Sequence, residues 1–193
     1  MRLCIDINIW IAFLLTTQHG RSGTPAQAIV ALARGMKLGN RPVQLVVSVE
    51  MIDTVQRVLE RLGFSSLAAC TFGTSLIDLM KAGPEGLDPY LLISGRDQIA
   101  MRVREDAGVL ATAIAAKVNL LVTDNLTDFK TNDCEVFSTQ AVKSGGRERQ
   151  LFMLIHERQD RVCVIVAHPI DVVAWIEQGV EISSDSIRQI ISP

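Results

Sequence analysis

Carboxylates stand at both ends of residues 104–129, REDAGVLATAIAAKVNLLVTDNLTDF, a segment whose middle is almost wholly apolar. Asp106 precedes the apolar part, and Asp124 and Asp128 follow it. Another acid, Asp6, interrupts an apolar run near the start of the chain, where a carboxylate is costly to bury without a partner. Carboxylates that lie close together repel one another, and a divalent cation removes that repulsion. Because oxygen ligands favour Mg²⁺ or Mn²⁺ over zinc, these acids predict a magnesium or manganese site.

Each of these polar residues also has a purely structural explanation. Asp106 would be favourable at the N-terminus of a helix through charge alone. Asp6 or Asn8 could cap the helix that follows them. Asp124 and Asn125 are residue types that turns favour. The joint pattern therefore argues for a site more strongly than any one residue does.

The acids fall at the ends of predicted strands and helices. In RLCIDINI, residues 2–9, Leu3 and Ile5 would face one side of a strand, and Cys4 and Asp6 the other. The apolar pattern predicts further strands over residues 42–48, 119–123 and 134–138. Helices are expected over residues 10–17, 25–38, 49–62, 65–82, 104–118 and 139–145.

This alternation indicates an α/β fold with a mainly parallel sheet covered by helices on both faces. Ligand sites in such sheets form at the carboxyl ends of the strands, and Asp6 and Asp124 fall there. We expect residues 1–146 to form this domain. Residues 147–193 follow a different pattern: two strands over residues 149–157 and 161–168, then a helix over residues 169–179. They predict a C-terminal hairpin and helix that pack on the same domain.

Composition excludes several classes of protein. The chain has 193 residues and a net charge of −2, so a broad basic face for duplex DNA is not expected. Basic residues form only local groups, for which a solvated surface is the favoured explanation: Arg57, Arg61, Lys143, Arg147 and Arg149. The four cysteines show no zinc spacing and suit a reducing cytoplasm. Every apolar run is too short for a transmembrane helix, and Asp6 and Asn8 interrupt the run that imitates a signal peptide.

Other families that place polar residues at strand ends fit poorly. A phospho-receiver domain needs an adjacent pair of acids on its first strand, and this chain has none there. A dinucleotide-binding domain needs G-x-G-x-x-G after that strand, which is also missing. The three histidines lie near no nucleophile motif, and we expect His156 and His168 to be core or edge residues.

Three segments resemble the signatures of the PIN-domain ribonucleases, the family of the VapC-type toxins. CIDINIWIAFLL is similar to the D-x-N entry strand of that family. VVSVEMIDTVQRVL resembles its middle segment, in which a Ser precedes a helix that carries a catalytic Glu. The stretch over residues 104–129 resembles its second signature, an acid before an Ala-rich helix and then a strand that ends in Thr. Order and spacing agree over residues 1–142.

The resemblance implies a PIN-like three-layer α/β/α sandwich that hydrolyses RNA with the help of bound Mg²⁺ or Mn²⁺. By position, Asp6, Asp106 and Asp128 match the acids that hold the metal. Asn8 and Thr123 match polar positions that support the site.

Two positions depart from the family pattern. The family Glu lies about two turns into the middle helix, and Thr54 stands there in this chain. Asp53 is its neighbour and Glu50 lies one turn earlier, so either acid could take the place of that Glu. Asn125 stands where many members have another Asp.

Two hypotheses follow from the resemblance. The first is a metal-dependent endoribonuclease that acts as the toxin of a toxin–antitoxin pair. The second is a degenerate PIN scaffold that binds RNA or a protein without cutting. The resemblance also implies a homodimer and an antitoxin partner, whose helix could dock on the first helices near Trp10, Ile11 and Phe13. For Trp10 itself, core packing is the preferred explanation.

Overall fold

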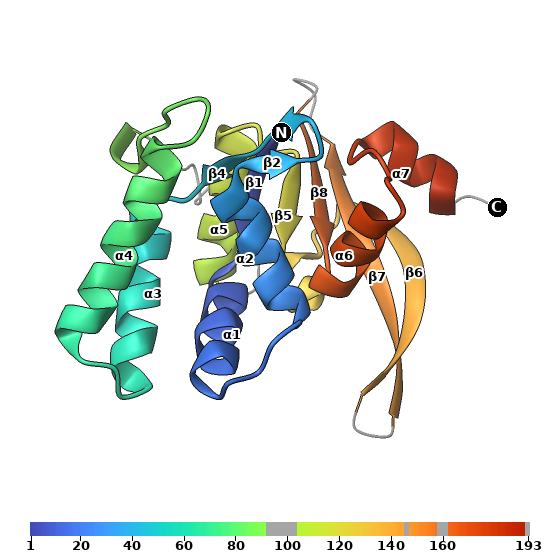
Figure 1. Ribbon diagram of the computed structural model, residues 1–193. Helices are drawn as coiled ribbons and strands as arrows, with labels where there is room; N and C mark the ends of the chain where they lie inside the picture. Colours follow the sequence, from blue (N-terminus) through green and yellow to red (C-terminus); the bar gives the residue numbers. More distant parts are fainter. Residues whose placement is uncertain (92–103, 145–146, 158–161, 192–193) are drawn as a thin grey trace.

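The computed structural model describes residues 1–91, 104–144, 147–157 and 162–191, and of residues 104–106, 144, 147 and 191 it describes the backbone alone. In this part of the chain a six-stranded sheet of order β4-β1-β5-β8-β7-β6 forms the centre (Figure 1). β4, β1, β5 and β8 are parallel, and β7 and β6 continue the sheet in antiparallel pairing. The strands are β1 (Arg2–Ile5), β4 (Gln44–Val46), β5 (Leu120–Val122), β6 (Glu135–Ser144), β7 (Arg147–Glu157) and β8 (Cys163–Ala167). A short hairpin of β2 (Lys37–Leu38) and β3 (Arg41–Pro42) stands apart.

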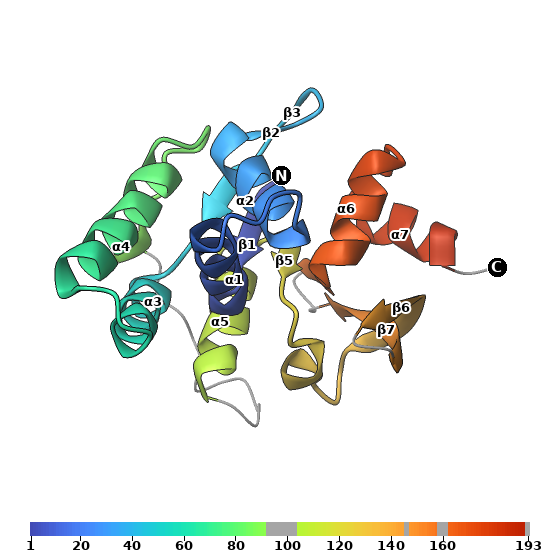
Figure 2. The ribbon, with the colours of Figure 1, turned by 60° about the horizontal axis from the view of Figure 1, so that its bottom comes forward.

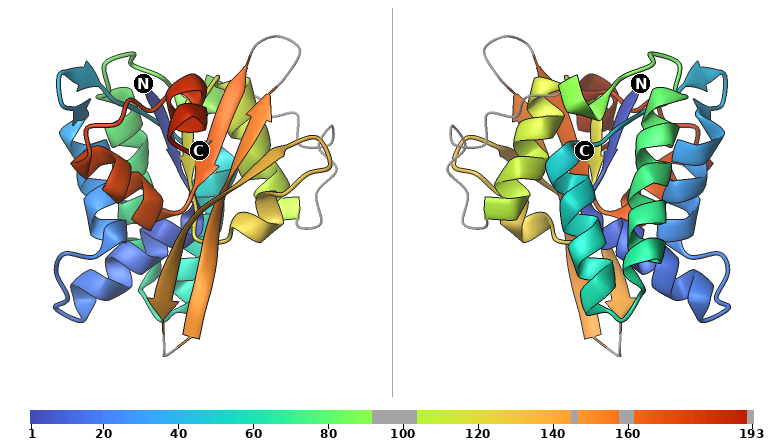
Figure 3. Two further views of the ribbon diagram at one scale, coloured as in Figure 1. Left: turned by 90° about the vertical axis from the view of Figure 1, so that its right-hand side faces the viewer. Right: turned by 90° about the vertical axis from the view of Figure 1, so that its left-hand side faces the viewer.

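Helices cover both faces of this sheet, as Figure 3 shows. One layer is formed by α1 (Ile7–Gln18), α2 (Pro25–Gly35), α6 (Pro169–Glu177) and α7 (Ser184–Ile191). The opposite face is covered by α5 (Arg104–Ala115) and the 3-10 turn η3 (Leu126–Phe129). At the β4 edge, α3 (Val49–Arg61) packs against α4 (Ser66–Lys81), and the 3-10 turn η1 (Pro89–Leu91) follows α4. The predicted three-layer α/β sandwich with a mainly parallel sheet is confirmed.

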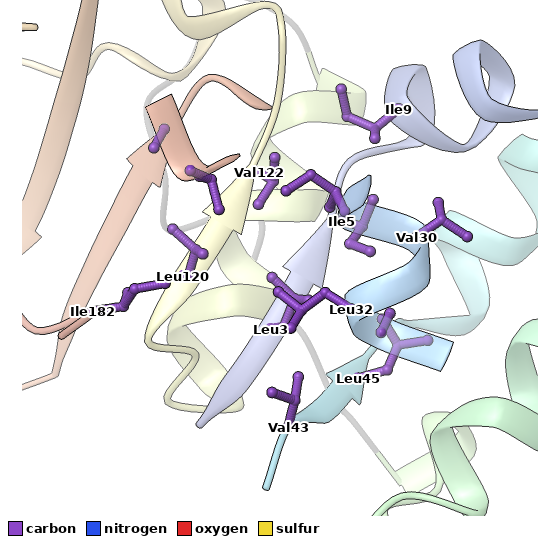
Figure 4. Packing of buried hydrophobic residues seen from close by; sticks show 14 of the residues in the cluster. Leu3, Ile5, Ile9, Val30, Leu32, Val43, Leu45, Leu120, Val122 and Ile182 are labelled. Atoms are coloured by element: carbon purple, nitrogen blue, oxygen red, sulfur yellow. The ribbon is translucent and has the colours of Figure 1, made fainter. Parts of the chain in front are cut away.

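Alternation along the strands divides the core into its two main layers. Leu3 and Ile5 of β1 belong to the layer of α1 and α2, whereas Cys4 belongs to the layer of α5. Figure 4 shows Leu3 and Ile5 beside Leu120 and Val122 of β5, on the face that α2 covers. The period of two in the sequence places side chains of one strand in opposite layers, as expected for a buried parallel strand.

The first strand is shorter than the sequence predicted. β1 ends at Ile5, and α1 begins at Ile7 instead of Trp10. The reason is a helix cap: the Asp6 carboxylate accepts a hydrogen bond from the Ile7 backbone N–H, at 2.7 Å. Within the described residues no helix is long and apolar enough to cross a membrane.

The helix predicted over residues 139–145 is wrong, because β6 continues to Ser144. Strand β7 supplies a pairing partner along its whole length, and pairs such as Val142 with Arg149 replace the local hydrogen bonds of a helix. The register shifts between Ser138 and Ala141, so a β-bulge interrupts β6 at Thr139 and Gln140.

The C-terminal hairpin of β7 and β8 joins the main sheet, since β8 pairs with β5 on one side and β7 on the other. The last strand in the sequence therefore lies inside the sheet rather than at its edge. The division of the chain into residues 1–146 and 147–193 stays a prediction.

Gly83 lies where the end of α4 approaches strand β4. The buried Gln44 amide donates to the backbone carbonyls of Leu45 and Met80, at 2.8 Å each, and its oxygen accepts from the Glu85 N–H at 2.8 Å. A Cβ on Gly83 would lie 2.5 Å from the oxygen of that amide and 2.6 Å from its nitrogen. Three hydrogen bonds hold the Gln44 amide in place, so moving it aside would break them.

We therefore expect Gly83→Ala to lower the free energy of unfolding by about 2–3 kcal/mol through overpacking. Gly35→Ala is the matched control, because no atom lies within 4 Å of the added Cβ. Alanine is the better helix former, so the control should be neutral or stabilising by up to about 1 kcal/mol. Urea unfolding of the two variants measures the difference, and equal values would contradict this account of Gly83.

Candidate active site

Polar residues gather where three neighbouring parallel strands end. Asp6 follows β1, Thr123 follows β5 and His168 follows β8. β4 lies on one side of β1, and β5, the next strand of this sheet in the sequence, lies on the other side of β1. The strand order therefore reverses between β1 and β5. Crevices at such switch points are where α/β sheets bind ligands. Figure 2 brings this edge forward, with α1 and α5 on one side of β5 and α6 on the other.

The Asp6 carboxylate is buried at this edge, with 4% of the residue exposed. One oxygen accepts the Ile7 N–H, and the other accepts the hydroxyl of Thr123 at 2.7 Å. The backbone holds the same register, since the Asp6 N–H donates to the Val122 carbonyl at 2.9 Å. Asp6 thus links the end of β1 to the start of α1 and to the end of β5.

Thr123 has no exposed surface, and its hydroxyl makes three hydrogen bonds. It donates to Asp6 and accepts from the Asn8 side-chain NH₂ at 3.1 Å and from the Asn125 N–H at 3.0 Å. A hydroxyl has one proton and two lone pairs, so its hydrogen-bonding capacity is full and its direction fixed. Thr123 therefore orients both Asp6 and Asn8.

Burial raises the pKa of Asp6 to about 6, because removal from water disfavours the charged carboxylate. Hydrogen bonds from Thr123, Ile7 and Asn8 act in the opposite direction, while the negative charge of Asp124 raises the pKa further. A buried carboxylate that its own neighbours stabilise only in part is a group that a cation would stabilise.

Among the described side chains, Asp124 is the acid whose negative charge raises the pKa of Asp6. It is exposed and directly follows Thr123. The side chain of Asp128 is instead paired within η3, where it accepts a hydrogen bond from the Asn125 NH₂. Asp128 is partly exposed, and the structure brings it to Asn125 rather than to Asp6.

The two candidates for the family Glu differ in position, although both are exposed. A Glu50 carboxylate oxygen lies 3.4 Å from the position of a Cβ on Gly108, so Glu50 reaches α5. No described contact brings Asp53 to the site. At the position of the family Glu, Thr54 is buried and accepts a hydrogen bond from the Arg57 guanidinium at 2.8 Å.

Asp106 lies in the first turn of α5, as the sequence predicted, but its side chain is outside the described part of the structure. Among the described side chains, no group of three His, Cys, Asp or Glu residues is placed to hold a metal ion. Two acids, Asp6 and Asp124, face this edge. Beside them the buried side-chain oxygen of Asn8 has no hydrogen-bond partner among the described residues. These oxygen donors fit a hard divalent cation, which needs at least one more ligand.

Residues 2–127 match the family model described as PIN domain. The chain belongs to the PIN-domain family. PIN domains are generally nucleases and typically use divalent metals. No curated protein and no solved structure matches the chain. The family match ends within η3, so β6, β7, β8, α6 and α7 lie outside the matched part of this PIN protein.

Two residues near the site were missing from the predicted set: His168 and Asp171. His168 follows an apolar strand and precedes Pro169, just as Asp6 follows β1 and precedes α1. That shared pattern of a polar residue after an apolar strand could have identified it. Asp171 is buried in α6, where it accepts hydrogen bonds from Thr139 at 2.9 Å and Gln140 at 2.7 Å.

The pKa of Asp6 predicts a specific pH dependence of stability without metal. A folded-state pKa of about 6, above the ordinary 3.8, means that the folded state holds the proton more tightly than the unfolded state. The resulting stabilisation is present below about pH 4 and is lost by about pH 6. Relative to Asp6→Asn, the free energy of unfolding of the native protein should fall by about 2–3 kcal/mol between pH 4 and 7.

Urea unfolding in EDTA at several pH values measures this difference between the native protein and Asp6→Asn. A hydrogen bond that Asp6→Asn loses at every pH shifts this difference by a constant amount, so it does not affect how the difference changes with pH. A difference that stays constant from pH 4 to 7 would show that Asp6 titrates in the ordinary acidic range.

Replacing Thr123 tests whether its hydroxyl holds the site together. Thr123→Val keeps the shape but removes the hydroxyl that bonds to Asp6, to Asn8 and to the Asn125 N–H. We expect it to lower the free energy of unfolding by about 2–4 kcal/mol. Thr123→Ser is the control, since it keeps the hydroxyl and loses only one methyl group, worth about 1 kcal/mol. Equal losses in the two variants would contradict a role for the hydroxyl.

Proposed function

We propose that this PIN protein is a metal-dependent endoribonuclease that hydrolyses phosphodiester bonds of RNA. One observation carries the proposal: the switch point of the sheet holds a buried carboxylate, Asp6, fixed by Thr123 and next to Asp124. Burying a carboxylate here lowers the stability of the fold, and buried groups of this kind cluster at functional sites.

Asp6, Asp106 and Asp128 are the proposed metal ligands, as the sequence pattern suggests. The geometry adds Asp124 to this set, because its charge acts on Asp6. A bound Mg²⁺ or Mn²⁺ would supply positive charge against the phosphate and make a water molecule more acidic. Thr123 and Asn8 keep the Asp6 carboxylate and the Asn8 oxygen in fixed directions toward such an ion. Asn125 supports this arrangement by orienting the Asp128 carboxylate.

Glu50 is our proposed replacement for the family Glu, and its contact with α5 favours it over Asp53. Asp106 lies in the first turn of the same helix. From these positions Glu50 and Asp106 would complete the oxygen ligands that Asp6 and Asp124 begin.

We propose that the protein acts in the cytoplasm as the toxin of a toxin–antitoxin pair and forms a homodimer. The cysteine pattern supports the cytoplasm, and the resemblance alone supports the toxin role and the homodimer. An antitoxin helix would have to dock beside Trp10 rather than on it. Trp10 is 2% exposed, its indole N–H donates to the Ile5 carbonyl at 3.2 Å, and its ring packs edge-on against Phe72.

The direct test is cleavage of a mixed single-stranded RNA pool by the purified protein. We expect cleavage with Mn²⁺ or Mg²⁺, none in EDTA, and a loss of at least about 100-fold in Asp6→Asn. Thermal unfolding confirms that both proteins are folded. Cleavage that persists in EDTA, or in folded Asp6→Asn, would contradict this site.

Thr54 at the position of the family Glu supports a second candidate, a PIN scaffold that binds RNA or a protein without cutting. Metal titration separates the two. A metal site raises the Tm as Mn²⁺ is added, and Asp6→Asn should abolish that shift. A folded native protein that shows neither cleavage nor a Tm shift would favour the scaffold.

A further inference from the structure

Strand β8 extends the site edge of the sheet beyond the part that matches the PIN family. Val122 of β5 is in register with Ala167 of β8, and the Thr123 N–H donates to the Ala167 carbonyl at 3.1 Å. His168 therefore starts from the same level of the sheet as Thr123 and Asp6. Neighbouring strands lie about 4.8 Å apart, so the three backbone positions form a row about 10 Å long.

Asp124 links the two ends of this row electrostatically. Its charge acts on Asp6 and also on His168. The surroundings of His168 include two further charged groups, Asp171 of α6 and Arg149 of β7. His168 is thus a neighbour of the acids, although it comes from a part of the chain outside the family match.

The hydrogen bond of the His168 ring defines which nitrogen faces a ligand. Nδ1 accepts the Ile170 N–H at 3.2 Å and caps α6, so in the neutral ring the proton lies on Nε2. Burial lowers the pKa of His168, which favours the neutral ring. Within the described residues Nε2 has no hydrogen-bond partner, and the residue is only partly buried. A single N–H donor is therefore available next to the acids.

Strands β6 and β7 continue past the end of β8 as a two-stranded ribbon, residues 139–152 without 145–146. The register of β7 against β8 places Phe152 about level with His168, so Arg149 lies beyond the carboxyl edge of the sheet. Figures 1 and 3 show this ribbon projecting on the side where α1 begins. Arg149 is exposed and pairs with Val142 across the ribbon.

The buried carboxylate of Asp171 fastens the ribbon to α6. It accepts hydrogen bonds from Thr139 and Gln140, the two residues of the β-bulge in β6. The bulge directs the side chains of Thr139 and Gln140 to the same carboxylate, that of Asp171, which lies three residues after His168. These two hydrogen bonds therefore join the ribbon that carries Arg149 to the helix that His168 caps.

We propose that His168 and Arg149 form a subsite for an RNA backbone phosphate, next to the phosphate that is cut over Asp6 and Asp124. A phosphate accepts hydrogen bonds readily from a ring N–H and from a guanidinium. The negative charge of Asp124 lies on the side of the scissile bond, so the strand would cross from the acids to the basic corner. This subsite rests on the proposed ribonuclease function and makes it more specific: at this subsite RNA is held through its backbone, a contact that carries no sequence information.

Two variants separate phosphate binding from the structural role of His168. His168→Asn keeps an oxygen that can cap α6, and Asn is a preferred cap residue, so the Tm should equal or exceed that of the native protein. It removes the Nε2 donor. Arg149→Gln removes the charge, and Arg34→Gln is the control, because Arg34 is an exposed arginine at the end of α2 near the opposite edge of the sheet.

The measurement is fluorescence anisotropy of a labelled single-stranded RNA in EDTA, where metal-dependent cleavage cannot occur. We expect Kd to rise about tenfold in His168→Asn and in Arg149→Gln, and to change less than twofold in Arg34→Gln. Arg149→Gln should also reduce the slope of log Kd against log salt concentration by about one.

Native Kd values in both folded variants would overturn the subsite, and so would failure of the native protein to bind RNA in EDTA. Cleavage by the same native preparation with Mn²⁺ tests the proposed function separately. Cleavage together with unchanged variants would leave the nuclease standing and remove only the subsite.

Discussion

The hydrogen bond from Thr123 to Asp6 is the contact on which the site depends. It joins the ends of β1 and β5, which are distant in the sequence but adjacent in the sheet. Asp6 also starts α1, and Thr123 also holds Asn8 and the turn that begins at Asn125. Burying a carboxylate costs stability, and the hydrogen bonds to Asp6 offset that cost only in part, which supports the proposed site at this edge.

Local sequence patterns predicted most of the fold because they act within one element. The alternation of Leu3, Cys4 and Ile5 placed β1 correctly between two layers. The helix expected from residue 25 does begin at Pro25, where a capping box of Thr24 and Gln27 starts α2. The helix expected over residues 139–145 failed because the strand there is set by β7, a partner that the local pattern of β6 does not reveal.

The site was predictable to the extent that it follows from strand ends. Asp6 and Thr123 come directly after strands, and the structure brings them into contact. The order of strands is a tertiary property, so the place of β8 beside β5, and with it the approach of His168 to Asp124, could not be predicted from local patterns. Hydrogen bonding within a turn is equally hard to foresee, and it pairs Asp128 with Asn125.

The position of β8 also determines when the sheet can become complete. A chain is synthesised from its N-terminus, but the strand between β5 and β7 is the last of the described strands to be made. Until it emerges, β5 has an unpaired edge and the apolar faces of two layers lack part of their cover. Pairings between distant segments also form slowly. A nascent chain that already contains the proposed metal ligands would therefore still lack β8, so the carboxyl edge of the sheet is complete only after residues 163–167 have been made.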